Sequence, residues 1–475
     1  MSPRRSHIAA SAAQSELAVA LAELRTSLEL PDGFPADVLA EADAAASASP
    51  PPSVDHREIP FVTIDPAGSM DLDQALHIER RSGGFLVHYA IADVPGFVLA
   101  GGAVDREARE RGQTLYAADG RVPLHPPVLS EDRVSLLPEV DRTAFVWSFE
   151  LDEAGVVERT GLERAQMRSR ERLGYDEAQA RIDAGGDPLE LLREVGLARI
   201  EQERARGGAS LNSPEEEIVR SDGGYVLKRR HLLPVEAWNA QLSLMTGMAA
   251  AAIMLEARVG ILRTMPKPTA ERIESFRTQT EALGRPWPES VTYGEYLRSL
   301  DRDDPAALAV MQVAGGLFRG AGYEAMDGRV PADPEQSALA APYAHVTAPL
   351  RRLVDRWGLV VCEALVAGRE VPTWARETLH ELPALMGASS QRASRLDSAS
   401  VARVEAAVLS DRVGQRFTAT VLEIRGENAV IQLAEPAVTA TCPVTTGARA
   451  GTTVEVVLEH TDIGSGEMRF RAAGG

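Results

Sequence analysis

The stretch from which the fold can be predicted is FVTIDPAGSMDLDQALHI, residues 61–78. Its first four residues are aromatic or β-branched, which is typical of a β-strand, and this run ends at Asp65. Pro66 and Gly68 follow and indicate a turn. A second run of alternating character begins at Asp71. The stretch therefore predicts a strand, a turn and a second strand.

Three acidic side chains of this stretch are expected to lie close together. In an extended second run, Asp71 and Asp73 share one face and Gln74 lies on the other, while the turn can return Asp65 to their side. Carboxylates held that close repel one another unless a cation lies between them, and a hard divalent ion with oxygen ligands fits this need. Mg²⁺ is the natural candidate, with Mn²⁺ as an alternative. A solvated turn without function remains the alternative for this spacing alone.

Sequence blocks beyond the acids follow a recognisable order. AIADVPGFV occupies residues 90–98, VPLHPPVLSEDRVSLLP residues 122–138 and MRSRERLGYDE residues 167–177. Much later, YAHVTAPLRRLVD occupies residues 343–355. Together with the acidic stretch, this order resembles the ribonuclease II (RNB) family of exoribonucleases. The resemblance covers roughly residues 55–410.

The resemblance implies a fold, a reaction and a set of site residues. The expected fold class is α+β, with a β-barrel-like core wrapped by helices around a buried RNA channel. The expected reaction is 3′-to-5′ hydrolysis of single-stranded RNA to nucleoside 5′-monophosphates by metal-assisted phosphodiester cleavage. By resemblance, Asp65, Asp71 and Asp73 hold the metal, Asp73 and Arg351 are catalytic, and a metal-activated water attacks the phosphorus in line.

A second chemical site is expected around Arg351 and Arg352. Pro349 suits the first turn of a helix that Thr347 can cap. Cations there oppose the helix dipole, whereas free N–H groups and guanidinium forks at a helix start bind a phosphate. An ion pair between Arg351 and Asp355 is the structural alternative, and it can coexist with function.

Two tyrosines complete the expected RNA contacts. By resemblance, Tyr116 and Tyr175 contact the terminal nucleotides, and Arg352 joins them as an RNA-binding residue. Stacking of a base on an aromatic ring contributes ~1–3 kcal/mol and tolerates any base, as a non-specific nuclease requires. Packing of half-buried tyrosines is the alternative.

Two glutamines depart from the family pattern. Gln74 stands where the family usually has a fourth aspartate, and the segment Asn239-Ala240-Gln241 lies where relatives commonly carry acidic residues that help to hold the terminal ribose. These neutral side chains motivate a second hypothesis, in which the chain is a catalytically weakened RNA-binding protein on the same scaffold.

The length of 475 residues predicts two or three units. We expect a helical leader and linker over residues 1–55, the RNB catalytic domain over 56–410 and an OB-fold RNA-binding barrel over 413–475. In the leader, Leu17, Leu21, Leu24 and Leu28 fall on one helical face, and a second short helix is expected over 35–46. Residues 54–173 read mostly as strands and loops, and residues 176–410 mainly as helices, at 188–206, 235–257, 269–283, 305–318, 349–367 and 372–409. Strands of the C-terminal barrel are expected at 417–424, 429–433, 453–458 and 467–471, where Phe417 and Phe470 are the aromatic residues that could stack on RNA. Many relatives place two small β-barrels before the catalytic domain, and the leader is too short for them. Ala44 to Ser53 reads as a linker.

The net charge and the cysteine content limit which partners and which cellular compartment are compatible with the sequence. A net charge of −19 argues against coating nucleic acid through bulk charge, which leaves local basic clusters to line a channel. Cys362 and Cys442 are far apart in the sequence and indicate a reducing compartment. We find no signal peptide and no apolar run that approaches a membrane span. The expectation is a cytoplasmic monomer whose partner is single-stranded RNA, not a membrane.

Overall fold

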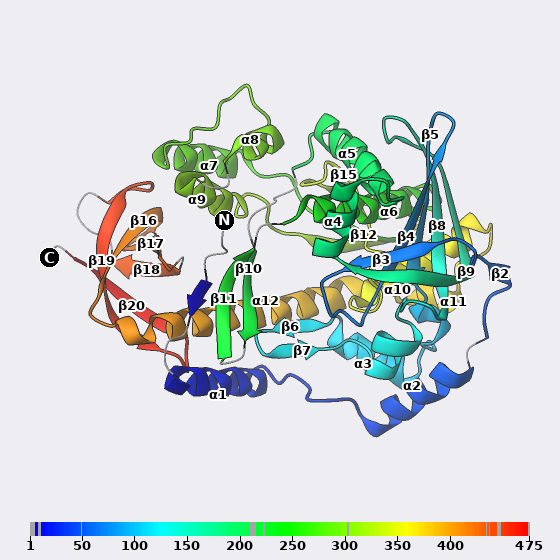
Figure 1. Cartoon of the computed structure of the whole chain (residues 1–475), viewed down its shortest axis with the longest axis horizontal. Helices are drawn as coiled ribbons and strands as arrows, with labels where there is room; N and C mark the ends of the chain where they lie inside the picture. Colours follow the sequence, from blue (N-terminus) through cyan, green and yellow to red (C-terminus); the bar gives the residue numbers. More distant parts are fainter. Residues whose placement is uncertain are drawn as a thin grey trace.

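The computed structural model describes residues 5–7, 11–48, 50–209, 215–221, 224–230, 232–301, 304–433, 435–436, 438–443 and 448–473. A closed β-sheet with helices around it forms the larger part, and a smaller β-sheet at the carboxyl end lies beside it (Figure 1). The predicted α+β class, with a barrel-like core and a C-terminal barrel, is confirmed.

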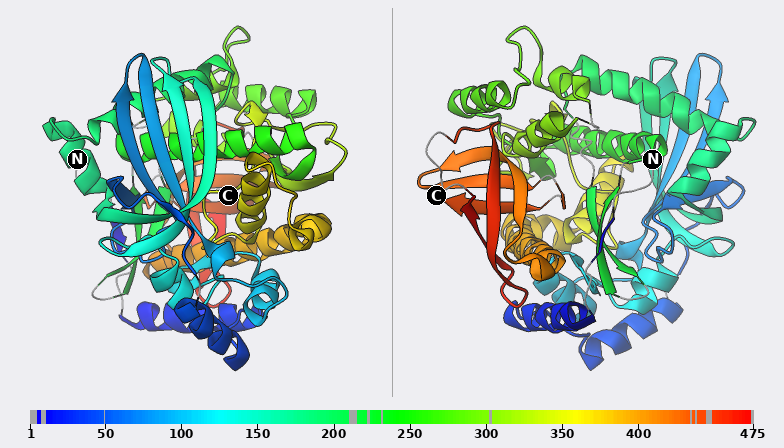
Figure 2. Two further views of the ribbon diagram at one scale, coloured as in Figure 1. Left: turned by 90° about the vertical axis from the view of Figure 1, so that its right-hand side faces the viewer. Right: turned by 60° about the vertical axis from the view of Figure 1, so that its left-hand side comes forward.

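The central sheet closes on itself. Its strand order is β2-β9-β3-β4-β5-β8, and β9 pairs with β8 as well as with β3, which completes a ring (Figure 2, left). The pairs that β9 makes with β2 and β3 are parallel, and the others are antiparallel. The strands are β2 Val54–Asp55, β3 Phe61–Asp65, β4 Gln74–Arg81, β5 Gly84–Ala92, β8 Asp141–Asp152 and β9 Val157–Gly174.

Both faces of β5 are covered by apolar residues, which explains its nearly continuous apolar sequence. Val87, Tyr89 and Ile91 belong to one buried cluster, together with Trp147 of β8. Ala90 faces the other side and belongs to a second buried cluster. The barrel wall is therefore a two-sided core, and it gives the strand ends that carry the acids a rigid support.

The helices follow the predicted ranges closely, and α6 and α10 form much of the core. The range predicted as one helix over 372–409 is divided into two α-helices by a short 3-10 turn, Leu379–Glu381. The helices are α4 Tyr175–Ala184, α5 Glu190–Ala205, α6 Pro234–Ala257, α7 Ala270–Ala282, α8 Tyr293–Ser299, α9 Pro305–Ala314, α10 Leu353–Val366, α11 Thr373–Thr378 and α12 Leu382–Leu409.

The half of the chain predicted as mainly helical also contains strands. The hairpin β10 Glu215–Ser221 and β11 Gly224–Arg230 is joined by β1 Arg5–His7, and β12 Val259–Thr264 pairs with β13 Gly322–Asp327. Strand β12 was missed because its apolar run continues that of α6 without a Gly or Pro between them. Arg258, at φ +57°, turns the chain there instead.

By length and composition alone, α6 is apolar enough to cross a membrane, contrary to our expectation that no segment approaches such a span. Its most apolar window has 44% of its residues buried inside the protein. Val235, Leu242 and Met254 lie in the main core cluster. The helix thus has the burial of a core helix.

The leader packs on the rest of the protein. Its helices, α1 Ser11–Ser27 and α2 Ala36–Ala48, occur where predicted, but α2 extends into the expected linker. On α1, Leu17 and Leu21 contact a cluster that contains Val404 and Val408 of α12. On α2, Glu41 accepts a hydrogen bond from the main-chain N–H of Ala103 at 2.6 Å, at the start of α3 Ala103–Arg111.

The carboxyl end forms a five-stranded sheet in the order β18-β17-β16-β19-β20. Phe417 and Phe470, the two aromatic residues considered for stacking on RNA, are buried and pack edge-to-face in its core. They are therefore not available to a strand of RNA. Strand β18 was not predicted. The strands are β16 Arg416–Arg425, β17 Asn428–Leu433, β18 Thr439–Pro443, β19 Thr453–Asp462 and β20 Glu467–Ala472.

Candidate active site

The turn after β3 presents the acidic stretch at one end of the barrel. Pro66 and Gly68, the latter at φ +86°, turn the chain directly after Asp65. The next strand begins at Gln74 rather than at Asp71 as predicted. Leu72, which is fully buried, anchors the intervening residues in the core. Asp71 and Asp73 lie on either side of Leu72 in this segment.

Asp73 and Arg351 lie together, as expected from the sequence. The Oδ2 atom of Asp73 is 3.6 Å from the Nε atom of Arg351, and its Oδ1 atom accepts a hydrogen bond of 2.8 Å from the main-chain N–H of Leu350. Burial raises the pKa of Asp73 to about 8, against the opposing charge of Arg351. The side chain of Arg351 is 44% exposed, so its guanidinium remains accessible to an anion.

Asp65 is a half-buried acid with one unpartnered oxygen. Its Oδ2 atom is buried without a hydrogen bond. Burial first, and then the charge of Asp71, raise the pKa of Asp65 to about 6, while Arg351 and Arg172 act in the opposite direction. Asp65 therefore belongs to the same electrostatic neighbourhood as Arg351, although β3 and residue 351 are far apart in the sequence.

Asp71 pairs with an arginine that the sequence analysis did not single out. Its Oδ1 atom is 2.6 Å from Nη1 of Arg121, and Nη2 of Arg121 is 2.7 Å from Oε1 of Glu131. Arg121 lies in β7 Gly120–Val122, one strand of a short hairpin with β6 Leu115–Ala117. No pattern in the sequence pointed to this pair, because it depends on how the hairpin folds back over the acids.

The acids fit a divalent cation, although they do not form a finished metal site. Within the described ranges, no group of three or more His, Cys, Asp or Glu side chains is close enough to hold an ion. The unpartnered Oδ2 of Asp65 and the raised pKa of that group are those of a carboxylate without a direct ion-pair partner, whereas Asp73 has Arg351 beside it. Joint metal binding by these two and Asp71 stays a prediction, and it requires Asp71 to leave Arg121.

The predicted helix start at Pro349 is wrong, because α10 begins at Leu353. The main-chain N–H of Ala348 donates to Oδ2 of Asp355 at 2.7 Å, and that of Leu350 donates to Asp73. Carboxylates of the protein thus occupy N–H groups that the sequence analysis assigned to a phosphate. Of the groups that were predicted to bind a phosphate, the guanidinium of Arg351 remains accessible.

Arg352, and not Arg351, forms the ion pair with Asp355. Its Nε and Nη2 atoms contact the two carboxylate oxygens of Asp355 at 2.9 and 2.8 Å. The structural alternative, a pair of Arg351 and Asp355, is therefore not the one that forms. Arg352 lines the cavity described next, but its side chain is only 18% exposed and its charge is compensated.

A cavity of about 390 Å³ opens beside Arg351. Tyr116 in its wall is 54% exposed, which leaves its ring free to stack on a base. Tyr175 begins α4, next to Gly174, the residue of β9 that pairs with Asp65. Burial first, and then the charge of Asp65, raise the pKa of Tyr175 to about 12. The lining residues are Gln113, Thr114, Tyr116, Arg351, Arg352, Ala393, Ser394 and Asp397.

The two glutamines of interest have different positions. Gln74 donates from Nε2 to the main-chain oxygen of Thr347 at 2.7 Å and accepts a hydrogen bond from the hydroxyl of Tyr89, so it links the barrel to the loop before Arg351. Gln241 is buried and donates to Glu203 of α5 at 2.8 Å. Its amide therefore belongs to the contact between α6 and α5.

Asn239 is the residue of this segment that lies near the acids. Its Nδ2 atom is 3.4 Å from the main-chain oxygen of Ile64, the neighbour of Asp65. The concern about a missing acid at the ribose therefore applies to position 239 rather than to Gln241.

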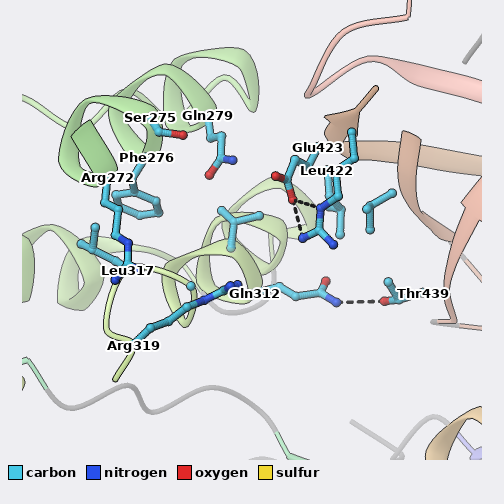
Figure 3. Close-up of a pocket in the computed structure, with 14 residues that line it drawn as sticks. Arg272, Ser275, Phe276, Gln279, Gln312, Leu317, Arg319, Leu422, Glu423 and Thr439 are labelled. Atoms are coloured by element: carbon cyan, nitrogen blue, oxygen red, sulfur yellow. Dashed lines mark hydrogen bonds and ion pairs between the residues drawn. The ribbon is translucent and has the colours of Figure 1, made fainter. Parts of the chain in front are cut away.

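A larger groove of about 580 Å³ lies between α7, α9 and the C-terminal barrel (Figure 3). Gln312 spans it, with Nε2 donating to Oγ1 of Thr439 at 2.8 Å. Arg425 in its wall is paired with Glu423. Arg272 and Arg319 also line the groove, and neither forms an ion pair with any residue that the structure describes. Among the residues that the structure describes, the groove therefore carries two arginines without an ion-pair partner.

Comparison with known proteins follows the same division of the chain. Residues 53–365 match the RNB domain family, and residues 415–473 match the RNase II-type exonuclease C-terminal S1 domain. Ribonuclease R of Escherichia coli is 30% identical over 323 residues, which are 64% of this chain and 39% of that protein. This chain thus spans well under half of that relative.

Solved structures show the same fold at low sequence identity. The apo form of Mycoplasma genitalium RNase R superposes with a TM-score of 0.85 at 17% identity, covering 96% of this chain and 78% of that one. Yeast Ssd1, described as a pseudonuclease, superposes with a TM-score of 0.65 at 16% identity, covering 86% of this chain and 52% of that one. The fold is thus found in an RNase and in a protein described as a pseudonuclease.

Proposed function

This chain belongs to the RNB family, and from that membership we propose that it is a metal-dependent exoribonuclease that shortens single-stranded RNA from its 3′ end to nucleoside 5′-monophosphates. The observation that carries the proposal is the opposition of Asp73 and Arg351 at 3.6 Å, beside the unpartnered carboxylate of Asp65. Asp73 and Arg351 are in ion-pair contact, so a scissile phosphate would bind beside this pair, at the exposed side of the Arg351 guanidinium.

Each residue has a defined part in the proposed reaction. Arg351 donates to the non-bridging oxygens of the phosphate and stabilises the charge that develops there. Asp73, whose Oδ1 accepts from the main-chain N–H of Leu350, keeps Oδ2 beside Nε of Arg351 and so holds that guanidinium in position. Tyr116 and Tyr175 hold the terminal nucleotides. A divalent cation bound by Asp65, Asp73 and the released Asp71 would supply Lewis-acid stabilisation at the phosphate.

The activity is tested with 5′-labelled single-stranded RNA, with and without Mg²⁺. Release of mononucleotides from the 3′ end by the wild type, and loss of release in Asp73→Asn, are expected. RNA blocked at its 3′ end should resist degradation. Asp141→Asn serves as the matched control, because that exposed acid pairs with Arg57 and Arg168 away from the site.

The second candidate is an RNA-binding protein with little or no hydrolysis. It is favoured by Gln74, by the pairing of Asp71 with Arg121 and by the likeness to a structure described as a pseudonuclease. Tight binding of RNA without metal-dependent release of mononucleotides would select it. In that case Asp73→Asn would leave the affinity for RNA nearly unchanged.

We also propose that the groove between α7, α9 and the barrel holds the backbone of RNA upstream of the 3′ end. Its support is the pair of arginines without an ion-pair partner among the described residues, Arg272 and Arg319. Each phosphate contact on a single strand contributes about 0.7 to the slope of affinity against salt. Substituting both arginines by glutamine should therefore lower that slope by about 1.4 for long RNA. An unchanged slope would contradict this path.

A further inference from the structure

We infer that the leader is a positioning element of the active site, in which residues 17–34 fix the hairpin β6–β7 that carries Tyr116 and Arg121. This inference rests on the proposed function, because it takes Tyr116 as a contact of the terminal nucleotides. Figure 1 shows α1 lying along α12, with the hairpin on the same side of the molecule. Arg25, Leu24 and Leu30 are the positioning residues.

The hairpin has one functional face and one packing face. Tyr116 and Arg121 are directly opposite each other in the register, so their side chains share a face. Tyr116 lines the cavity beside Arg351, and Arg121 contacts Asp71. Leu115 and Val122, the next pair, are both buried. The residues that pack on Leu115 and Val122 therefore determine the direction of the opposite face, which carries Tyr116 and Arg121.

The leader supplies much of that packing. Leu115 and Val122 form a buried cluster with Leu24 and Leu30 of the leader and with Leu396 of α12. Each strand of the hairpin has only three residues, and a two-stranded ribbon of that size is not stable by itself in water. The hairpin is thus ordered between α1 and α12, and loss of the leader contacts would loosen it.

The leader also contacts the tip of the hairpin through an ion pair. The guanidinium of Arg25 contacts both carboxylate oxygens of Asp119, with Nε–Oδ1 and Nε–Oδ2 distances of 3.0 Å and an Nη2–Oδ1 distance of 2.7 Å. Each side chain is 22% exposed. Ala118, the other residue of the tip, packs on the cluster formed by α1 and α12. The fork geometry fixes the direction of the tip as well as its position.

The base of the hairpin is tied to the arginine segment. The main-chain N–H of Thr114 donates to the oxygen of Arg351 at 3.0 Å, and Gln113 and Arg352 form an isolated β-bridge. The hairpin is therefore held at its base by the segment of Arg351 and at its tip by α1. A shift of α1 would move Tyr116 relative to Arg351 and would disturb the contact of Arg121 with Asp71.

Arg25→Gln tests the inference in the full chain. The KM for single-stranded RNA should rise by a factor of about 2–5, the size expected for one partly exposed ion pair, while kcat is retained. In a Tyr116→Ala background the same change should raise KM less than it does in the wild type, because one of the two groups through which it acts is gone. Exchanging the charges, with Arg25→Asp and Asp119→Arg together, should restore KM. Arg376→Gln, which removes the exposed pair with Asp327 elsewhere, is the matched control.

A second measurement separates this inference from the proposed activity. Amide hydrogen exchange over residues 115–122, measured without RNA or metal, should be faster in Arg25→Gln than in the wild type or in Arg376→Gln. Unchanged exchange together with additive effects of Arg25→Gln and Tyr116→Ala on KM would overturn the inference. Faster exchange in a protein that degrades no RNA would refute the activity and support the coupling of α1 to the hairpin.

Discussion

Replacing Asp65 by Asn should stabilise the metal-free protein in a manner that depends on pH. The pKa of Asp65 is raised from 3.8 to about 6, mainly because the carboxylate is buried and close to Asp71. A tenfold change in proton affinity corresponds to about 1.4 kcal/mol, so the charged form of Asp65 costs up to about 3 kcal/mol of folding free energy above pH 6. The amide carries no such cost.

The sign follows from proton binding. The native state binds the proton of Asp65 more tightly than the unfolded state does, so this group makes the free energy of unfolding fall as pH rises from about 4 to about 6. Asp65→Asn lacks this dependence. The stability of the variant minus that of the wild type should thus increase by up to about 3 kcal/mol between pH 4 and pH 7, whatever constant effect the amide has.

Urea unfolding in EDTA at several pH values measures this difference. Asp73 titrates in both proteins and cancels from the comparison to first order. Asp71→Asn is the contrasting variant: it loses the 2.6 Å contact with Arg121 and should destabilise the metal-free protein. With Mg²⁺ added, the wild type should gain more stability than Asp65→Asn. A difference between variant and wild type that stays flat from pH 4 to pH 7 would refute the view of Asp65 as an unpartnered buried anion.

Three further substitutions test the site. Arg351→Lys should lower the single-turnover rate by about 10²–10³ and change RNA affinity much less, because a lysine cannot reproduce the guanidinium fork at the phosphate. Tyr116→Ala should weaken RNA binding, measured with Asp73→Asn protein, by ~1–3 kcal/mol per stacked base, whereas Tyr175→Ala should also lower the melting temperature because that ring packs on the core. Gln74→Glu should cost about 1–3 kcal/mol in urea unfolding, since a carboxylate would face the main-chain oxygen of Thr347; tighter Mg²⁺ binding at unchanged stability would contradict this.

Much of the fold could be predicted because local patterns and long-range packing agree. The strand that ends at Asp65 and the turn after it occur where expected, and the long helices begin and end close to their predicted residues, although β4 begins at Gln74 rather than at Asp71. The closeness of Asp73 and Arg351 was expected from the family resemblance, since local pattern alone cannot bring residues 73 and 351 together.

The details of pairing could not be predicted, because they depend on competition between distant groups. Arg352 takes Asp355 since α10 starts four residues later than expected, and that start depends on carboxylates that occupy the N–H groups of Ala348 and Leu350. Gln241 could not be oriented because α6 is apolar on most of its surface, so its sequence does not show which side faces the acids.

Strand β9 contains one extra residue, and this bulge affects how correct folding of the purified protein should be assessed. Phe61 pairs with Ser169 but Val62 pairs with Glu171, so β9 bulges by one residue there before Asp65 meets Gly174. Because a slip of one residue turns every side chain of a strand to the opposite face, a misregistered β3 would bury or misdirect Asp65 without emptying the barrel. Such molecules would be soluble and compact. Specific activity per folded molecule, rather than yield or solubility, is therefore the measure of correct assembly.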